Sequence, residues 1–68
     1  MTNNIKKIRV LKGVKQYELA NAAGISSPYL FDLENGNRGA KPETLERIAT
    51  ALGVTVNDLL DMNDEHDA

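Results

Sequence analysis

Residues 16–34 read QYELANAAGISSPYLFDLE, and this stretch predicts two short helices around a tight turn. Gly24 stops the first helix, and Pro28 is tolerated in the first turn of the second. Because the residue before a proline avoids helical angles, Ser27 is favoured as the N-cap, with Ser26 as the competing choice. The inward-facing apolar residues of the first helix are Leu19, Ala20 and Ala23.

Upstream of this stretch, apolar residues three positions apart indicate another helix, which ends before Gly13. Asn3 or Thr2 can cap its start. Arg9 falls beside the apolar stripe, so its charge is expected to need a partner. The stripe consists of Ile5, Ile8 and Leu11.

Downstream, two more helices are predicted. Pro42 opens the first of them and Gly53 stops it. Its apolar positions match the helical template without a gap: Leu45, Ile48, Ala49 and Leu52. Thr55 and Asp58 resemble a capping box, with Asp in place of Glu, and open a short fifth helix that reaches Leu60. No strand pattern is present, so the sequence predicts an all-α fold of five helices.

The 68 residues, of 7.5 kDa, suit one small domain. We expect this domain to cover residues 1–62, followed by an acidic, disordered tail at 63–68. No apolar run approaches the ~20 residues of a membrane span. The sequence contains no cysteine, which excludes disulfides. We therefore expect a soluble, cytoplasmic protein without membrane contact.

The net charge of −2 conceals a separation of charge along the chain. All eight Lys and Arg lie in residues 1–47, where the balance is +3. Residues 48–68 hold five acids and no Lys or Arg, so their balance is −5. The overall acidity therefore does not exclude an anionic partner, because the basic groups are segregated from the acids.

Catalytic and metal chemistry find no support. The single histidine, His66, lies in the acidic tail, and the acids around it lack the spacing of a calcium loop. The glycines do not form a phosphate-binding loop. We expect no enzyme activity, no cofactor and no metal site.

A longer pattern links these elements. Its parts are Gln16-Tyr17-Glu18-Leu19-Ala20, Gly24-Ile25-Ser26, Leu30, Leu33-Glu34-Asn35-Gly36, Leu45 to Ala49, Ala51-Leu52-Gly53-Val54 and Leu59-Leu60. In residue type and spacing it resembles the phage repressor/Cro-type helix-turn-helix family, also called the XRE family, over residues 5–60. The resemblance implies a five-helix, lambda-repressor-like DNA-binding domain, usually dimeric. It also implies a transcriptional repressor of a prophage, a mobile element, or a restriction–modification or toxin–antitoxin locus, associated with the nucleoid.

The helix after the turn is the expected reader of the DNA major groove. Leu30 and Leu33 define its inner face at about 100° per residue. The resemblance implies that Ser26, Ser27, Pro28 and Asp32 face bases, and the helical spacing directs Phe31 outward, where it too could meet a base. Asp32 could accept from a cytosine amine, or be a plain solvated acid, and the two serines could simply be caps. Phe31 could contact a thymine methyl, or pack back on Tyr29 or the preceding helix.

Phosphate contacts are expected around the same edge. Gln16 lies at a helix N-terminus, where free amides and the helix dipole favour an anion. The resemblance implies that this glutamine touches DNA. The hydroxyl of Tyr17 could reach a phosphate. The other candidates are Lys15, Asn35, Asn37, Arg38 and Lys41.

Two structural roles complete the predictions. The resemblance implies that Arg9 and Glu34 form an ion pair that holds the recognition helix. In the fifth helix Leu59 suits the core, which leaves Leu60 and Met62 as candidates for a two-fold homodimer interface. Such a dimer would read a palindromic operator with half-sites about one turn, ~10 base pairs, apart.

The rival interpretation is a protein-interaction module of the antitoxin or anti-repressor type. Tyr17, Tyr29 and Phe31 could form its binding surface. No sensor domain is apparent in the sequence, so control by concentration or by a protein regulator is expected rather than control by a small ligand. Salt-dependent DNA binding discriminates the two interpretations.

Overall fold

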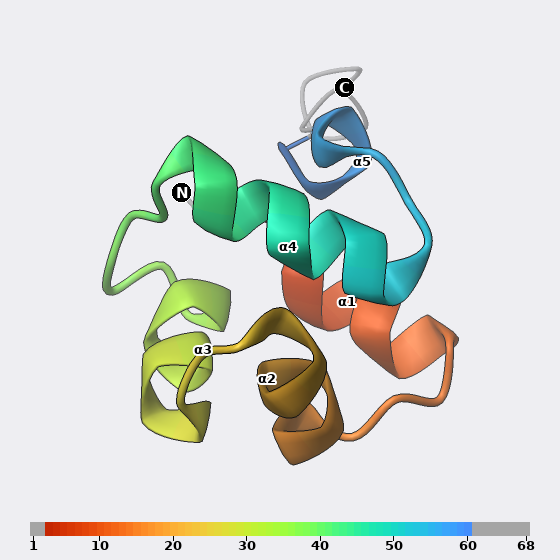
Figure 1. Ribbon diagram of the computed structural model, residues 1–68, viewed down its shortest axis with the longest axis horizontal. Coiled ribbons are helices and arrows are strands. Elements are labelled where there is room, and N and C mark those ends of the chain that lie inside the picture. Colours follow the sequence, from red (N-terminus) through yellow and green to blue (C-terminus); the bar gives the residue numbers. More distant parts are fainter. Residues whose placement is uncertain (1–2, 61–68) are drawn as a thin grey trace, which may run out of the picture.

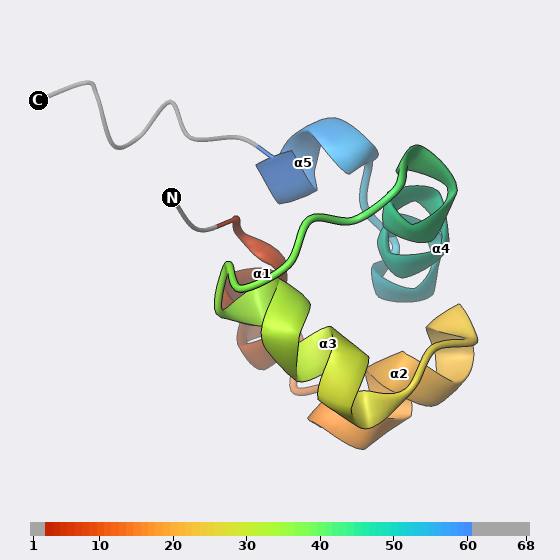
Figure 2. The same ribbon diagram turned by 90° about the vertical axis from the view of Figure 1, so that its left-hand side faces the viewer.

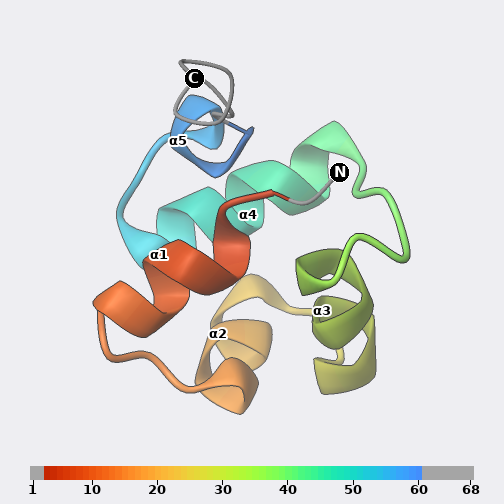
Figure 3. The same ribbon diagram turned by 180° about the vertical axis from the view of Figure 1, so that it is seen from behind.

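The computed structural model describes residues 3–60, which form five α-helices and no strands. The all-α prediction is therefore confirmed. The helices are α1 (Ile5–Leu11), α2 (Gln16–Ala23), α3 (Ser27–Glu34), α4 (Pro42–Leu52) and α5 (Val56–Leu60). In Figure 1, α4 runs above the α2–α3 pair, and α5 lies beyond α4. Seen from behind in Figure 3, α1 lies nearer to the viewer than α4. The predicted boundary between residues 62 and 63 and the interface candidate Met62 lie outside the described residues.

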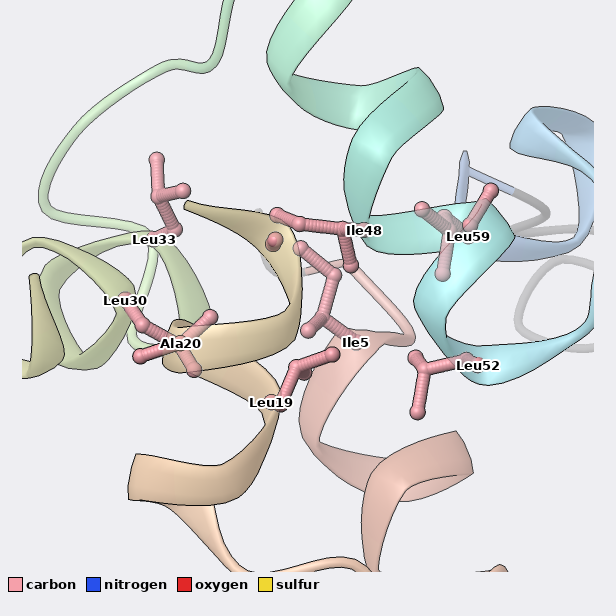
Figure 4. Close-up of a cluster of buried hydrophobic side chains, with 10 residues drawn as sticks. Ile5, Leu19, Ala20, Leu30, Leu33, Ile48, Leu52 and Leu59 are labelled. Carbon is pink, nitrogen blue, oxygen red and sulfur yellow. The ribbon is translucent and has the colours of Figure 1, made fainter. Parts of the chain in front are cut away.

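One apolar core joins all five helices. Six large side chains are less than 2% exposed: Ile5, Leu19, Leu30, Leu33, Ile48 and Leu59. Figure 4 shows Ile5 and Ile48 pointing toward one another near the centre of this cluster. Burying each such side chain contributes about 1.5–3 kcal/mol. The inner face of α3 is therefore fixed against the rest of the domain.

The buried face of α1 differs from the predicted apolar stripe of Ile5, Ile8 and Leu11, because Leu11 is 76% exposed. Counting by threes loses 60° at each step, so Leu11 lies about 120° around the helix from Ile5. Arg9 lies only about 40° from Ile5 and is buried instead. Ile8 is half-buried.

Polar side chains lie at the starts of α1 and α3. The N-cap of α1 is Asn4, which makes no side-chain cap bond, and not Asn3 or Thr2 as expected. The Oδ1 atom of Asn3 accepts the N–H of Ile5 at 3.0 Å, and its Nδ2 donates to the Leu33 carbonyl at 2.9 Å. In α3 the N-cap is Ser26, whose Oγ accepts the N–H of Tyr29 at 3.2 Å. The preference for Ser27 as N-cap was wrong, because the extended backbone that a pre-proline residue favours is only a bias, and the cap bond of Ser26 outweighs it.

The short helix α5 is tied to the start of α1. The N–H of Asn4 donates to the Leu59 carbonyl at 2.9 Å, and its Nδ2 donates to the Asp58 carbonyl at 3.1 Å. The expected capping box is confirmed: the Thr55 N–H donates to Asp58 Oδ2 at 3.0 Å, and the Asp58 N–H donates to Thr55 Oγ1 at 3.1 Å. Leu59 is fully buried, whereas Leu60 is 47% exposed.

Candidate nucleic-acid interface

A tight turn presents α3 on the outer side of the molecule. Gly24 ends α2 with φ 73° and ψ 30°, in the left-handed region that glycine adopts without strain. The next N–H, of Ile25, donates to the Ala20 carbonyl at 3.0 Å and closes the helix end. A Cβ on Gly24 would lie 3.9 Å from Arg47, so its backbone angle rather than lack of space requires glycine. Figure 2 shows α3 toward the viewer, with α2 beside it.

The outward face of α3 carries the expected base readers at different exposures. Ser26, Pro28 and Phe31 are exposed, whereas Ser27 and Asp32 are half-buried. Phe31 is 52% exposed, so the domain leaves half of this ring uncovered. Ser26 accepts a hydrogen bond as N-cap, and its hydroxyl can still donate one to a ligand.

A buried ionic network holds the two ends of the helix-turn-helix together. Arg9 and Glu34 form the expected pair, with Nε to Oε2 at 2.6 Å and Nη2 to Oε1 at 3.2 Å. Their side chains are 11% and 1% exposed. Arg9 Nη1 also donates to the Val14 carbonyl at 2.9 Å, and Gln16 Nε2 donates to Glu34 Oε1 at 3.0 Å. The network connects α1, the start of α2 and the end of α3.

This network changes what Gln16 can offer to DNA. One N–H of its amide is directed inward to Glu34, so the other N–H and the Oε1 atom remain for an outside partner. Sequence reasoning placed Gln16 at the helix N-terminus and missed this inward bond. At the same end, the Lys15 N–H donates to Glu18 Oε1 at 2.9 Å. Tyr17 is 55% exposed.

The segment between α3 and α4 carries the remaining candidates. Asn37, Arg38 and Lys41 are exposed. Asn35 is exposed too, but its Nδ2 donates to the Phe31 carbonyl at 2.8 Å, so one of its donors is used within α3. The backbone N–H of Asn37 donates to the Asp32 carbonyl at 2.9 Å and folds the segment back on the helix.

An aromatic contact that the sequence did not suggest links this segment to α3. The guanidinium carbon of Arg38 lies 5.6 Å from the centroid of the Tyr29 ring. This distance is within the ~6 Å at which a cation is attracted to an aromatic face. The two residues are nine positions apart and Arg38 lies outside α3, so no helical spacing could have signalled the pair.

A match to known proteins covers nearly all of this architecture: residues 5–59 match the helix-turn-helix family model HTH_3. The chain belongs to the helix-turn-helix family. The resemblance carried by the sequence pattern is thereby confirmed, and members of this family act as DNA-binding transcriptional regulators.

Individual relatives show the extent of the likeness. The chain is 39% identical over 61 residues to the HTH-type transcriptional regulator DdrOP3 of Deinococcus deserti, covering 90% of this chain and 47% of the relative. It is 36% identical to the control protein C.BamHI of Bacillus amyloliquefaciens, covering 90% and 86%. The solved complex of the SinR and SinI proteins matches with a TM-score of 0.80 and 34% identity, covering 93% and 60%. The chain thus spans about half the length of the Deinococcus relative.

Residues 3–60 show neither a metal site nor a membrane-spanning helix. No group of three or more His, Cys, Asp or Glu side chains in this range could hold a metal ion. None of the five helices has the length and apolar character that crossing a bilayer requires.

Proposed function

We propose that this chain binds double-stranded DNA in a sequence-specific way, with the N-terminal half of α3 in the major groove. In this proposal it represses transcription of a prophage, mobile-element, restriction–modification or toxin–antitoxin locus. One observation carries the proposal: Pro28 and Phe31 on the outer face of α3 are exposed, and groups that suit phosphates lie at the start of α2, which contacts the end of α3, and on the segment that follows α3. A major groove about 12 Å wide admits a helix of this size.

The flanking groups divide into two sets. The first set lies at the start of α2, which offers an N-terminal dipole end together with Lys15, Gln16 and Tyr17. The second set consists of Asn37, Arg38 and Lys41, which are exposed after the end of α3. Phosphate contacts from both sets would fix the register of α3 in the groove without themselves reading sequence.

Base discrimination is assigned to the outer face of α3. The hydroxyls of Ser26 and Ser27 can donate to base acceptors, and the ring of Phe31 can cover a thymine methyl. The carboxylate of Asp32 accepts from a cytosine amine and repels a misplaced phosphate, so it would add selectivity by attraction and by repulsion.

A two-fold dimer would bring two such helices to one operator. Leu60 is 47% exposed at the end of α5, whereas its neighbour Leu59 is fully buried. A self-complementary patch around Leu60 serves both subunits of a two-fold pair. Two copies of α3 would then enter successive major grooves of a palindrome, about 10 base pairs apart.

The test is the salt dependence of binding to duplex DNA. Each neutralised phosphate contributes about −0.9 to the slope of log K against log salt. Arg38→Ala or Lys41→Ala should therefore make this slope less steep by about one unit and weaken binding to all DNA sequences equally. Lys12→Ala, an exposed lysine at the end of α1 that lies beside Val54 and Asp58, is the matched control and should leave the slope unchanged. Failure to bind any duplex at low salt would overturn the proposal.

A second candidate function is binding of a protein partner. Tyr17 and Phe31 are exposed aromatic side chains on the α2–α3 surface. A solved relative is a complex of two proteins, SinR and SinI. An antitoxin or anti-repressor module would use this surface without DNA, so the salt titration above separates the two functions.

A further inference from the structure

We propose that Tyr29 is a positioning residue that holds Arg38 ready for a phosphate before DNA arrives. This inference rests on the proposed function and deepens it. It assigns to Tyr29 a role in DNA binding that neither the helix pattern nor the family match gives to that position.

Both the backbone and the side chain of Tyr29 are held in place. It is the third residue of α3, and its backbone N–H is held by the Ser26 hydroxyl. Its side chain is half-buried and packs against the apolar core. The ring is therefore a fixed surface, and the face that Arg38 covers belongs to a rigid element.

Arg38 is the exposed member of the pair, and the residues before it are bonded to α3. The amide of Asn35 is bonded to the Phe31 carbonyl, and the N–H of Asn37 is bonded to the Asp32 carbonyl. These two bonds tie the residues before Arg38 to α3. Its exposed side chain can then lie back along the helix, with the guanidinium carbon 5.6 Å from the ring centroid.

Stacking and phosphate binding use different parts of the guanidinium. When the guanidinium lies flat on the ring, the ring covers one face of the group, and the five N–H donors point outward in its plane. A phosphate can therefore be bound in a bidentate way while the stack is kept. Since a long, exposed arginine otherwise loses rotamer freedom when it binds, ordering it beforehand lowers the cost of complex formation.

Nuclear magnetic resonance on the free protein tests the geometry directly. The Cδ protons of Arg38 should be shifted upfield by the ring, and Tyr29→Phe should keep this shift. Tyr29→Leu should abolish it while the far-UV circular dichroism spectrum is retained. Random-coil shifts for these protons in the wild-type protein would overturn the proposal without any use of DNA, even if Tyr29→Leu fails to fold.

Binding to duplex DNA tests the consequence. Tyr29→Leu should weaken binding about two- to five-fold, the range expected for an exposed cation–aromatic contact, and Tyr29→Phe should restore it. In the Arg38→Ala background, Tyr29→Leu should have no further effect.

Two results would contradict the role of Tyr29 while leaving DNA binding intact. Tighter binding by Tyr29→Leu would show that the stack competes with the phosphate. An equal loss with and without Arg38 would show that Tyr29 acts by another route. If the wild-type protein binds no duplex at low salt, the proposed function fails and this role of Tyr29 fails with it.

Discussion

Replacing either member of the buried ion pair should destabilise the domain strongly. Arg9→Met leaves the Glu34 carboxylate, 1% exposed, without its ionic partner and bonded to the amide of Gln16. A buried charge stripped of its partner costs about 3–5 kcal/mol. Glu34→Leu should cost about 2–4 kcal/mol, less because Arg9 is 11% exposed and keeps its bond to the Val14 carbonyl.

These losses are large beside the stability available. At about 0.05–0.15 kcal/mol per residue, a chain of this length is expected to unfold with a free energy of roughly 3–10 kcal/mol. The double variant Arg9→Met/Glu34→Leu removes both charges and fills the space with apolar atoms. It should lie within about 2 kcal/mol of the wild type. The coupling energy between the two positions is then about 3 kcal/mol or more.

Urea denaturation followed by far-UV circular dichroism measures all four proteins of this cycle. Lys12→Met, an exposed position at the end of α1, is the control and should change stability by no more than about 0.5 kcal/mol. Single effects that add to within about 0.5 kcal/mol would refute the reasoning, because independent sites add and a bonded pair does not.

Three further predictions concern the dimer, acid stability and the cap of α3. Leu60→Asp should fold normally and lose cooperative binding to a palindrome while keeping weak half-site affinity, and an unfolded circular dichroism spectrum would place Leu60 in the core. The Thr55 backbone N–H, and secondly its side chain, hold the pKa of Asp58 below its usual 3.8. The Asp58 carboxylate therefore stabilises the folded state fully above pH 3.8, and this contribution is lost as the pH falls through the lowered pKa. Asp58→Asn should make the free energy of unfolding depend less on pH in this acid range. Ser26→Ala should cost about 1 kcal/mol in urea denaturation and Ser27→Ala at most about 0.5, whereas equal losses would contradict the assignment of Ser26 as N-cap.

Much of the fold could be predicted because local residues dictate it. Gly24 and Gly53 adopt left-handed angles at the ends of α2 and α4, and Pro42 stands in the first turn of α4. Such positions depend on backbone sterics alone, so the sequence reveals them. The error at Leu11 came from counting by threes in a helix of seven residues, where the angular drift decides which side is buried.

Less of the candidate site could be predicted, because its geometry depends on contacts between elements. Helical spacing placed Arg9 beside the apolar stripe, but its bond to the Val14 carbonyl depends on how the chain turns after α1. The inward bond of Gln16 and the stack of Arg38 on Tyr29 depend on how α1, α3 and the following segment pack. Residue type supplies the donors, whereas tertiary packing decides which of them face outward.

Selection of binding sites from random duplex DNA at low salt tests the central claim most directly. The wild-type protein should enrich a defined sequence with two inverted half-sites about 10 base pairs apart. Asp32→Ala, on the outer face of α3, should change the preferred bases, whereas Lys41→Ala should weaken binding and keep the same bases. Two results would contradict the assignment of α3 as the reader of the major groove. In the first, the wild-type protein enriches no sequence. In the second, Asp32→Ala and the other variants on the outer face of α3 all select the same bases as the wild type.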